Sequence, residues 1–332
     1  MKSIVLNNEL DSKIQFIESP VPSANRDEAV VKIKAAALNH RDEWSRKGLY
    51  PNLKNGVILG SDGSGMVNAV GSEELSHWMG KEVIINPAIN WGSSQLAQSK
   101  NFEILGMPRN GTLAEYVSVP ADRLHEKPPH LSWEEAGALP LAGLTAYRAL
   151  VYQGQVKAGD KVLVTGIGGG VAQFAAQFAL ALGAEVYVSS SSESKSAKAL
   201  EMGISGVFNY KLESWTQEAL EKTGGFDLII DGAAGDTLNN LITVAKPGGK
   251  IVFYGATMGN PGKLETRKIF WNQLKIMGST MGSDQDFKEM LDLVSAKKIR
   301  PVIDEVFPLE NAVDAFDRMK AGAQFGKIVL TP

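Results

Sequence analysis

Residues 162–179, VLVTGIGGGVAQFAAQFA, are the most informative segment for the fold of this chain. It begins with a continuous apolar run, passes through a group of glycines and ends with apolar side chains at helical spacing. This order predicts a buried strand, a tight loop and a helix. Glycines let the backbone approach phosphate oxygens closely, and a helix N-terminus offers unpaired N–H groups and a partial positive charge. The stretch therefore predicts a dinucleotide-binding loop.

The glycine spacing departs from the strict G-x-G-x-x-G pattern, because the sixth position counted from Gly166 is Val171. Ala172 follows Gly169 by three residues and is small enough to let the helix pack close to the sheet. A glycine-rich turn without a ligand is the alternative interpretation. The strand before the loop, the helix after it and the alternation that follows favour the binding site. The residues expected at the cofactor phosphates are Gly166, Gly168, Gly169, Gly170 and Val171.

Strand-like and helix-like segments alternate regularly after about residue 160. Apolar strands are expected at 161–165, 185–189, 206–210, 226–231, 250–255 and 272–283, with helix-like segments between most of them. Such unbroken apolar strands are typical of a parallel sheet that helices cover on both faces. Residues 1 to about 120 consist of short strand-like runs separated by Gly, Pro and Asn, which predicts a compact β-rich domain. The expected fold class is therefore α/β, with a doubly wound domain beside a β-rich one.

The composition excludes several classes of site and partner. The net charge of −3 and the pI near 5.9 leave no basic field that would attract nucleic acid or an anionic membrane. The chain has no cysteine, so disulfides, iron–sulfur clusters, thiolate zinc sites and a cysteine nucleophile are excluded. Its four histidines lack the spacing of a zinc-binding pair. A polar N-terminal segment and the lack of a long apolar run lead us to expect a soluble, cytoplasmic protein.

A serine tract follows the second strand of the alternating region, in VYVSSSSESK at 186–195. In a dinucleotide site this position, about 20 residues past the first glycines, lies beside the adenosine ribose. Sites that prefer NAD place Asp or Glu there, whereas hydroxyl and amine groups would hold the 2′-phosphate of NADP. We therefore predict NADP rather than NAD. The residues expected at this phosphate are Ser189, Ser190, Ser191, Lys195 and Tyr210.

The same tract has an interpretation that needs no ligand. Ser190 and Glu193 have the spacing of a helix capping box. Glu193 is also the one acidic residue near the expected phosphate, and it weakens the preference for NADP. The two interpretations are compatible, because a capped helix N-terminus also favours a phosphate.

The chain resembles the medium-chain dehydrogenase/reductase superfamily over essentially all of its length. The resemblance rests on ALNHRDEWSRKGLYP, GSDGSGMVNAVG, NGTLAEYVSVP, LPLAGLTAYRAL and VLVTGIGGGVA. It implies a GroES-like catalytic domain at 1–120, a Rossmann NADP-binding domain at 121–265, and a segment at 266–332. That last segment would add the final Rossmann strand and return to the catalytic domain. The resemblance also implies that two copies pair through strand edges as a homodimer.

Three further residues are expected at the cofactor. The resemblance implies that Thr145, in LPLAGLTAYRAL, contacts it. Gly255 and Ala256 end the fifth strand, at the edge where parallel sheets present ligands. An ordinary helix threonine and a simple turn are the respective alternatives.

Zinc-dependent members of this superfamily carry ligands at positions that this chain changes. The resemblance places their cysteine at Asn39, their His-Glu pair at Ser61 and Asp62, and a further Cys or Asp near Leu141. Their cysteine-rich structural lobe corresponds to residues 86–110, which contain no cysteine here. The pattern NxxDxxxRxGLYP, which begins at Asn39, resembles the zinc-less quinone oxidoreductases and enone reductases instead. We therefore expect no zinc.

These observations predict an NADPH-dependent oxidoreductase that transfers a hydride to a quinone or an α,β-unsaturated carbonyl compound without a metal. Hydride addition to such a substrate leaves a conjugated oxygen, which is much less basic than an alkoxide and needs only a few hydrogen-bond donors. Asn39, Asp42 and Tyr50 are the candidate catalytic residues, with Arg41 or water as the proton source. Asn39 and Asp42 are equally compatible with a turn, and Tyr50 with a half-buried ring.

Two other functions stay open on the sequence alone. One is an alcohol dehydrogenase that acts on simple alcohols or aldehydes. The other is a nucleotide-binding protein without turnover. The expected ligand is a small molecule in each case, but no motif identifies the physiological substrate.

Overall fold

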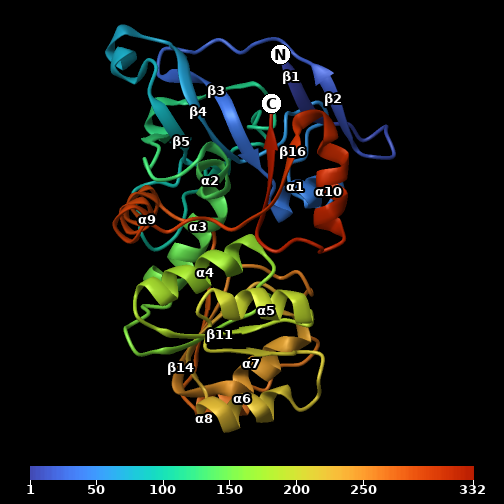
Figure 1. Ribbon diagram of the computed structural model, residues 1–332, viewed down its shortest axis with the longest axis vertical. Helices are drawn as coiled ribbons and strands as arrows, with labels where there is room; N and C mark the ends of the chain where they lie inside the picture. The colour runs from blue at the N-terminus through green and yellow to red at the C-terminus, as the bar shows by residue number, and fades with distance from the viewer. The chain divides into compact units, whose positions relative to one another are not determined.

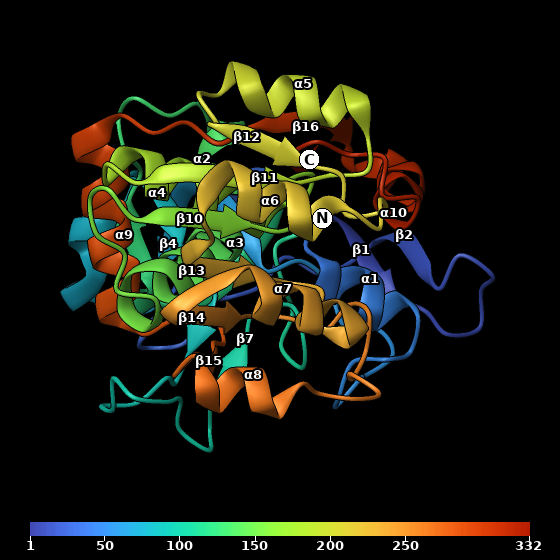
Figure 2. The same cartoon turned by 90° about the horizontal axis from the view of Figure 1, so that it is seen from below.

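The computed structural model describes residues 1–332 and contains the expected parallel sheet. Its strands follow the order β12-β11-β10-β13-β14-β15, which Figure 2 shows from top to bottom. The strands are β10 (Lys161–Val164), β11 (Glu185–Ser189), β12 (Gly206–Phe208), β13 (Phe226–Asp231), β14 (Ala245–Phe253) and β15 (Lys275–Gly278). Because the chain runs outward from β10 in both directions, the strand order reverses beside β10. Open α/β sheets bind ligands at such a point, at the carboxyl ends of the strands.

Continuous apolar residues explain why these strands are buried on both faces. Val162, Leu163 and Val164 of β10 are fully buried. Tyr187 of β11 stacks on Phe208 with the ring centroids 5.9 Å apart, and Phe226 meets Tyr187 edge-on at 5.6 Å. Each such ring pair contributes about 0.5–1.5 kcal/mol beyond the area it buries.

Helices connect the parallel strands, as the alternation in the sequence predicts (Figure 1). They are α4 (Gly170–Ala181), α5 (Glu193–Glu201), α6 (Trp215–Thr223), α7 (Leu238–Val244) and α8 (Thr266–Trp271). Phe174 and Phe178 of α4 are buried, and this helix contacts β10, β11 and β13. None of the helices in the structure is both long and apolar enough to cross a bilayer.

A second sheet, of seven strands, takes five of its strands from residues 28–126 and two from the C-terminal segment. Its order is β16-β17-β3-β4-β5-β9, and β8 pairs with β3. The strands are β3 (Glu28–Ala37), β4 (Asp62–Val70), β5 (Glu82–Ile85), β8 (Tyr116–Pro120), β9 (Leu124–Glu126), β16 (Ile303–Pro308) and β17 (Lys327–Thr331). β17 pairs antiparallel with β3, so the C-terminal segment contributes to this sheet (Figure 1).

The remaining elements are short and lie around the two sheets. Two small hairpin-like sheets are formed by β1 (Lys2–Leu6) with β2 (Ile14–Glu18) and by β6 (Ala88–Ile89) with β7 (Glu103–Ile104). The other α-helices are α1 (His40–Arg46), α2 (Trp133–Ala138), α3 (Pro140–Tyr147), α9 (Asp284–Lys297) and α10 (Ala312–Lys320). The chain also has a π-helix η3 (Arg148–Gln153) and the 3-10 helices η1 (Glu73–Trp78), η2 (Ala121–Arg123), η4 (Gly235–Thr237) and η5 (Leu309–Asn311).

The two compact units have boundaries that differ from the expected ones at 120 and 265. One unit comprises Met1–Ala142 with Gly282–Pro332, and the other comprises Gly143–Met281. The first boundary lies later because α2 packs on β3, β4 and β17 of the seven-stranded sheet. A Cβ at Gly137 would lie 2.7 Å from the Ala35 carbonyl oxygen, so only glycine permits this close approach. The second unit extends to Met281 because it includes β15, the final Rossmann strand that was expected after residue 265, which pairs with β14.

Ser132 and Glu135 form the capping box that their spacing predicts. Glu135 N donates to Ser132 Oγ at 3.2 Å, and Ser132 N donates to Glu135 Oε2 at 2.8 Å. The helix that follows ends at Ala138, because Pro140 has no N–H to continue it and instead begins α3.

Candidate functional site

The glycine loop joins β10 to α4 in a conformation that suits a phosphate. Gly166 has a φ of +65°, which side-chain-bearing residues rarely adopt. Ile167 N donates to Ser189 O at 3.2 Å, and Gly169 N donates to Gly166 O at 3.1 Å, so the loop is held by its own backbone. Gly169 is the N-cap of α4 and has no side chain to occupy the first N–H groups of the helix. Gly168, Gly170 and Val171 complete this turn and the start of α4.

Gln173 anchors the same loop, although it is not among the residues expected at the cofactor phosphates. Its Nε2 donates to Ile167 O at 2.7 Å, and its side chain is buried. Its Oε1 is buried without a hydrogen-bond partner in the structure. A buried polar atom without a partner costs free energy, so this oxygen fits a bound ligand or water beside the loop. The signal in the sequence is a glutamine on the apolar face of a helix.

The carboxyl ends of β13 and β14 lie next to this loop and contain small residues. Thr165 Oγ1 donates to Asp231 Oδ1 at 2.5 Å, which ties the end of β10 to the end of β13. A Cβ at Gly255 would lie 2.9 Å from the Gly232 carbonyl oxygen, so the two strand ends approach closely. Gly255 and Ala256 therefore lie at the sheet edge where they were expected. The uncapped helix start, the buried Gln173 oxygen and this edge together fit a dinucleotide.

The serine tract forms a turn whose hydroxyls are mostly engaged within it. Ser189 is buried, and its Oγ accepts from Gly166 N at 3.2 Å. Ser190 Oγ accepts from Ser192 N at 3.1 Å. Ser191 Oγ and Tyr210 Oη lie 3.1 Å apart, and both residues are exposed. The hydroxyls of Ser191 and Tyr210 are thus brought together, while Ser189 faces the glycine loop.

The predicted capping box of Ser190 and Glu193 is wrong. The N-cap of α5 is Ser192, whose Oγ accepts from Lys195 N at 3.4 Å. Ser190 lies two residues before the cap and bonds to the turn instead, because α5 begins only at Glu193. Lys195 lies in the first turn of α5, half-buried, close to the end of the tract.

A hollow of about 500 Å³ extends from the serine tract along the edge strand β12. Its lining is formed by Ser190, Ser191, Ser192, Glu193, Ser196, Ala197, Leu200, Ser205, Gly206, Val207, Asn209 and Lys222. Hydroxyl, amide and ammonium groups predominate among its polar groups, and Glu193 is its single carboxylate. The side chain of Lys222 also lies 5.9 Å from the centre of the Phe208 ring.

The resemblance places zinc ligands at Asp62 and at two positions in the same unit, Asn39 and Leu141. Asp62 is hydrogen-bonded to both of them. Asp62 Oδ1 accepts from Leu141 N at 2.7 Å, and Asp62 Oδ2 accepts from Asn39 Nδ2 at 2.9 Å. Lys327 Nζ donates to Asp62 Oδ2 at 2.8 Å and to Asn39 Oδ1 at 2.7 Å. Asp62 is fully buried, and the side chain of Lys327 is 4% exposed. A buried ion pair with an asparagine therefore occupies this place.

Lys327 was missed by the sequence analysis. It is the first residue of β17, in the segment KIVLT, and the other residues of that strand are apolar or threonine. The available signal was a lysine at the start of a strand that is otherwise buried. That pattern alone does not identify a partner, because its partners Asn39 and Asp62 lie 288 and 265 residues earlier in the chain.

The candidate catalytic residue Asp42 acts as an anchor for the start of α1. Its Oδ2 accepts from Asn39 N at 2.8 Å, and its Oδ1 accepts from Gly60 N at 3.3 Å. Burial raises the pKa of Asp42, while the Arg41 guanidinium and the Asn39 N–H oppose that rise. This placement favours the turn interpretation for Asp42. The side chain of Asn39 contacts Asp62 and Lys327.

Tyr50 and Arg41 form a separate network beside Ser61. Arg41 Nε donates to Tyr50 Oη at 3.3 Å, and its guanidinium lies 4.7 Å from the centre of the Tyr50 ring. Arg41 Nη1 also donates to Ser61 Oγ at 2.6 Å and to Leu105 O at 2.7 Å. Arg41 is buried and fully engaged, so its role is structural rather than that of a mobile proton source. The structure does not bring the Tyr50 hydroxyl to the amide of Asn39.

Thr145 lies in α3, and its side chain is buried. Its Oγ1 contacts Met281 Sδ at 3.8 Å. Met281 follows the end of β15, so the threonine packs beside the last strand of the six-stranded sheet. Contact between Thr145 and a cofactor stays a prediction.

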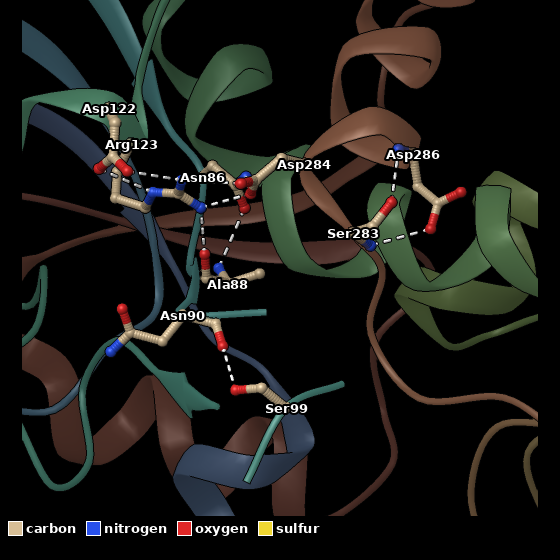
Figure 3. A network of polar contacts seen from close by, with 9 residues as sticks. All are labelled: Asn86, Ala88, Asn90, Ser99, Asp122, Arg123, Ser283, Asp284 and Asp286. Atoms are coloured by element: carbon tan, nitrogen blue, oxygen red, sulfur yellow. Dashed lines mark hydrogen bonds and ion pairs between the residues drawn. The ribbon is translucent and has the colours of Figure 1, made fainter. Parts of the chain in front are cut away.

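Hydrogen bonds hold the start of the segment that corresponds to the zinc lobe of relatives (Figure 3). Arg123 Nη1 donates to Ala88 O at 2.5 Å, and Arg123 Nη2 donates to Asp284 Oδ2 at 2.9 Å. Asn86 Nδ2 donates to Asp284 Oδ1 at 3.2 Å, while Ala88 N donates to Asn86 Oδ1 at 3.0 Å. In Figure 3 these side chains converge between Asn86, which follows β5, and Asp284 at the start of α9.

The rest of that segment folds around an aromatic pair. Trp91 is 2% exposed and meets Phe102 edge-on, with ring centroids 5.3 Å apart. Trp91 Nε1 donates to Ser94 O at 2.9 Å, and Ser99 Oγ donates to Asn90 O at 2.7 Å, the contact drawn in Figure 3. Side-chain packing and loop hydrogen bonds thus stabilise this segment, whereas thiolates bound to zinc stabilise the corresponding lobe in zinc-dependent members.

The donor set at Asn39, Asp62 and Leu141 does not fit a zinc ion. Leu141 has no ligating side-chain atom, and Ser61 Oγ donates to Leu105 O at 2.7 Å. The Lys327 ammonium lies against the carboxylate oxygen that a metal would need. No group of three or more His, Cys, Asp or Glu side chains in the structure is arranged to hold a metal ion. Zinc sites ordinarily use three or four such ligands.

Comparisons with known proteins match both units. Residues 25–129 match the alcohol dehydrogenase GroES-like domain, and residues 170–296 match the zinc-binding dehydrogenase family. The chain is 38% identical to the zinc-type alcohol dehydrogenase-like protein YogA of Leptosphaeria maculans, over 96% of this chain and 94% of that protein. It is 29% identical to a crotonyl-CoA reductase of Streptomyces avermitilis, over 95% of this chain and 81% of that protein. A crystal structure of an NAD-dependent alcohol dehydrogenase has 37% identity and a TM-score of 0.94, with all of both chains covered.

Proposed function

The chain belongs to the medium-chain dehydrogenase/reductase superfamily, and on that premise we propose that it reduces quinones or α,β-unsaturated carbonyl compounds with NADPH and without a metal. Its GroES-like domain and its Rossmann-like domain with six parallel strands confirm the fold that the sequence predicts. As a member of the superfamily, the chain is an NAD(P)-dependent oxidoreductase with a small-molecule substrate. When bound, the reduced nicotinamide supplies the hydride.

The contacts of Asp62 are the observation that carries the metal-free proposal. Both carboxylate oxygens accept hydrogen bonds, and Oδ2 accepts from both Asn39 Nδ2 and Lys327 Nζ. An ammonium group and a zinc ion would compete for the same oxygen. Lysine in its charged form is a donor and has no lone pair for a metal. The buried ion pair therefore supports a reaction in which hydrogen-bond donors, rather than a Lewis acid, stabilise the product oxygen.

The substrate class follows from that chemistry. A simple alcohol must be oxidised through an alkoxide, which zinc stabilises in metal-dependent dehydrogenases. A quinone or an enone yields a conjugated oxyanion, for which amide donors suffice. The name of the relative crotonyl-CoA reductase supports an α,β-unsaturated carbonyl substrate.

The preference for NADPH rests on the serine tract. No carboxylate follows β11 until Glu193, and the exposed Ser191 and Tyr210 hydroxyls meet at the end of the tract. Lys195 adds an ammonium in the adjoining first turn of α5. The similar solved structure is named an NAD-dependent enzyme, so the two cofactors need a direct comparison.

A literal alcohol dehydrogenase is the second candidate function. The names of YogA and of the solved structure favour it. This candidate requires a group that stabilises an alkoxide. Activity with ethanol-like substrates in the absence of activity with quinones and enones would support it.

The six-stranded sheet leaves β15 as an edge strand, because β14 is its one neighbour. Phe270 and Trp271, at the end of α8, are 67% and 80% exposed and precede this strand by a few residues. An unpaired strand edge beside exposed aromatic rings is a typical site for strand pairing with another chain. We propose that a second copy of this chain covers it, as the homodimer expected from the sequence.

The proposed function is tested by binding and turnover measurements on the purified protein. Fluorescence titrations with NADPH and NADH come first, and a panel of quinones and enones follows, monitored at the NADPH absorbance. We expect tighter binding of NADPH and turnover of at least one compound of the panel. Nucleotide binding without turnover of any quinone, enone or alcohol would contradict an enzymatic role.

Removal of metal provides a separate check. We expect elemental analysis to find no stoichiometric zinc, and dialysis against a chelator to leave the reductase activity unchanged. The reason is that Lys327, rather than a metal, lies against Asp62. Zinc that copurifies at about one equivalent per chain, with activity lost on chelation and restored by zinc, would contradict the metal-free mechanism.

A further inference from the structure

We propose that the Lys327–Asp62 ion pair holds the side-chain amide of Asn39 in one orientation, so that its NH₂ group donates a hydrogen bond to the substrate oxygen on which negative charge develops. This inference rests on the proposed reductase function and assigns Lys327 and Asp62 as positioning residues. The three side chains come from the N-cap of α1, the start of β4 and the start of β17.

The orientation of the amide follows from the chemistry of its two partners. A lysine ammonium only donates hydrogen bonds, and an ionised carboxylate only accepts them. Lys327 Nζ lies 2.7 Å from Asn39 Oδ1, while Asp62 Oδ2 lies 2.9 Å from Asn39 Nδ2. A flip of the amide by 180° would place NH₂ against the ammonium and the carbonyl oxygen against the carboxylate. Both contacts would then be repulsive, so the pair permits a single orientation.

The ion pair itself is fixed from several sides. Lys327 Nζ and Asp62 Oδ2 are 2.8 Å apart, which closes a triangle of three contacts with Asn39. Leu141 N donates to the other oxygen of Asp62, and Thr112 Oγ1 donates to the Asp62 main-chain oxygen at 2.6 Å. The amide of Asn39 is thus held by groups that are themselves anchored in the sheet.

This arrangement leaves one hydrogen of the Asn39 amide for a ligand. Nδ2 carries two hydrogens, and Asp62 accepts one of them. Asn39 is 7% exposed, so it is buried but not completely enclosed. The cationic donor at Oδ1 polarises the amide, which strengthens the remaining N–H as a donor. A donor fixed in this way stabilises an oxyanion without reorganisation during the reaction.

The pair is not explained by stability alone. Two charges taken out of water lose much of their hydration free energy, and replacing a buried ion pair by apolar residues is often neutral or stabilising. A function in positioning accounts for the presence of both charges beside an amide that they orient.

The test compares four variants of the full-length protein: Asn39→Ala, Lys327→Met, Lys327→Arg and the double variant Lys327→Met with Asp62→Asn. The double variant removes both charges, so it keeps the test valid if Lys327→Met alone does not fold. We expect Asn39→Ala and the double variant to lower kcat by about 10²-fold, the usual cost of losing one oxyanion donor. KM and the affinity for NADPH should stay within about threefold of wild type, because only the transition-state contact is lost. Lys327→Arg should recover most of the activity.

Non-additivity and spectroscopy distinguish positioning from a general structural effect. Adding Asn39→Ala to the double variant should lower kcat no further, because the three residues act as one unit. In NMR spectra, the side-chain amide signals of Asn39, identified by their loss in Asn39→Ala, should shift strongly in the double variant. Folded variants with wild-type kcat, or equal losses in kcat and NADPH affinity, would overturn the inference. A wild-type protein that reduces no quinone or enone would instead refute the proposed function, and unchanged NMR signals would then refute the positioning as well.

Discussion

At the scale of single residues, the most informative feature is the set of hydrogen-bond partners of Asp62. A buried carboxylate needs partners, and this one is satisfied by an ammonium, a side-chain amide and a main-chain N–H. The nearby Asp42 is equally buried but is used to anchor the start of α1. Two acidic residues of the same domain therefore have different roles, which their hydrogen-bond partners decide.

Lys195 provides the test of cofactor preference at this scale. We expect Lys195→Ala to weaken NADPH binding at least tenfold more than NADH binding, because the ammonium would pair with the 2′-phosphate that NADH lacks. The matched control is Lys198→Ala, on the same helix, which should affect neither cofactor. Fluorescence titrations of the three proteins check this. Equal losses for NADPH and NADH would show that Lys195 does not contact the 2′-phosphate.

Gly166 provides a second test, because its φ of +65° is strained for alanine. Gly166→Ala and Gly203→Ala should each lower the free energy of unfolding by about 1–2 kcal/mol, since both glycines have positive φ and open space around them. Only Gly166→Ala should weaken cofactor binding, by about tenfold or more, because the glycine loop is distorted. Chemical denaturation and titration with NADPH measure the two effects. A loss of binding in both variants would point to a general effect of stability.

At the scale of elements, the start of α5 depends on which serine caps it. Four consecutive serines offer equivalent side chains, and the pattern Ser190–Glu193 fits a capping box as a sequence. The chain path instead places Ser192 at the cap, because Ser190 is drawn into the turn after β11. The residue at which a helix begins depends on the direction in which the chain leaves the preceding strand. A local sequence pattern does not predict that direction.

The contact between β9 and α9 makes the stability of the folded protein depend on pH. The ring of His125 lies 4.7 Å from that of Phe287, and burial followed by the charge of Arg123 lowers the pKa of His125 from 6.5. The unfolded chain therefore binds a proton more readily than the folded one. Stability is fully present above pH 6.5 and falls as the pH drops toward the lowered pKa.

We expect the melting temperature of the wild type to fall between pH 7.5 and 5.5 more than that of His125→Gln, because glutamine does not titrate. His77→Gln serves as the control, since His77 is exposed and its variant should follow the wild type. Thermal unfolding followed by circular dichroism at several pH values measures the difference. An identical acid dependence in His125→Gln would exclude His125 as its source.

At the scale of the whole molecule, the C-terminal segment completes both sheets. β15 ends the six-stranded sheet, and β16 with β17 ends the seven-stranded one. This path carries Lys327 to Asn39, across 288 residues of sequence. The domain that supplies the first strands is therefore unfinished until the last residues of the chain have folded onto it.

The proposed dimer is tested by molar mass. We expect light scattering during size-exclusion chromatography to give about twice the 35.7 kDa of one chain. Trp271→Glu should shift the protein toward the monomer, because a charge beside β15 would be buried in the interface. Leu212→Glu is the control, since Leu212 follows β12 at the opposite edge of the sheet and is also exposed. A monomeric wild type would refute the dimer.

Features that depend on neighbours in the chain can be predicted from the amino-acid sequence alone. Apolar strands, helical periodicity and the glycines after β10 predict the six-stranded parallel sheet and its loop, because strand and helix patterns are local. The position of the serine tract also follows from its distance to those glycines. These patterns suffice for the fold class and for the expected place of the cofactor.

Which polar groups contact one another depends on the folded arrangement of the whole chain. Asn39 was identified from a motif, but its partners Asp62 and Lys327 come from distant strands, and Tyr50 belongs to the separate network of Arg41. The limits of the two units likewise depend on the packing of α2 and the pairing of β15. Buried charges are satisfied by whatever groups the fold brings within hydrogen-bond distance, and no local pattern records those contacts.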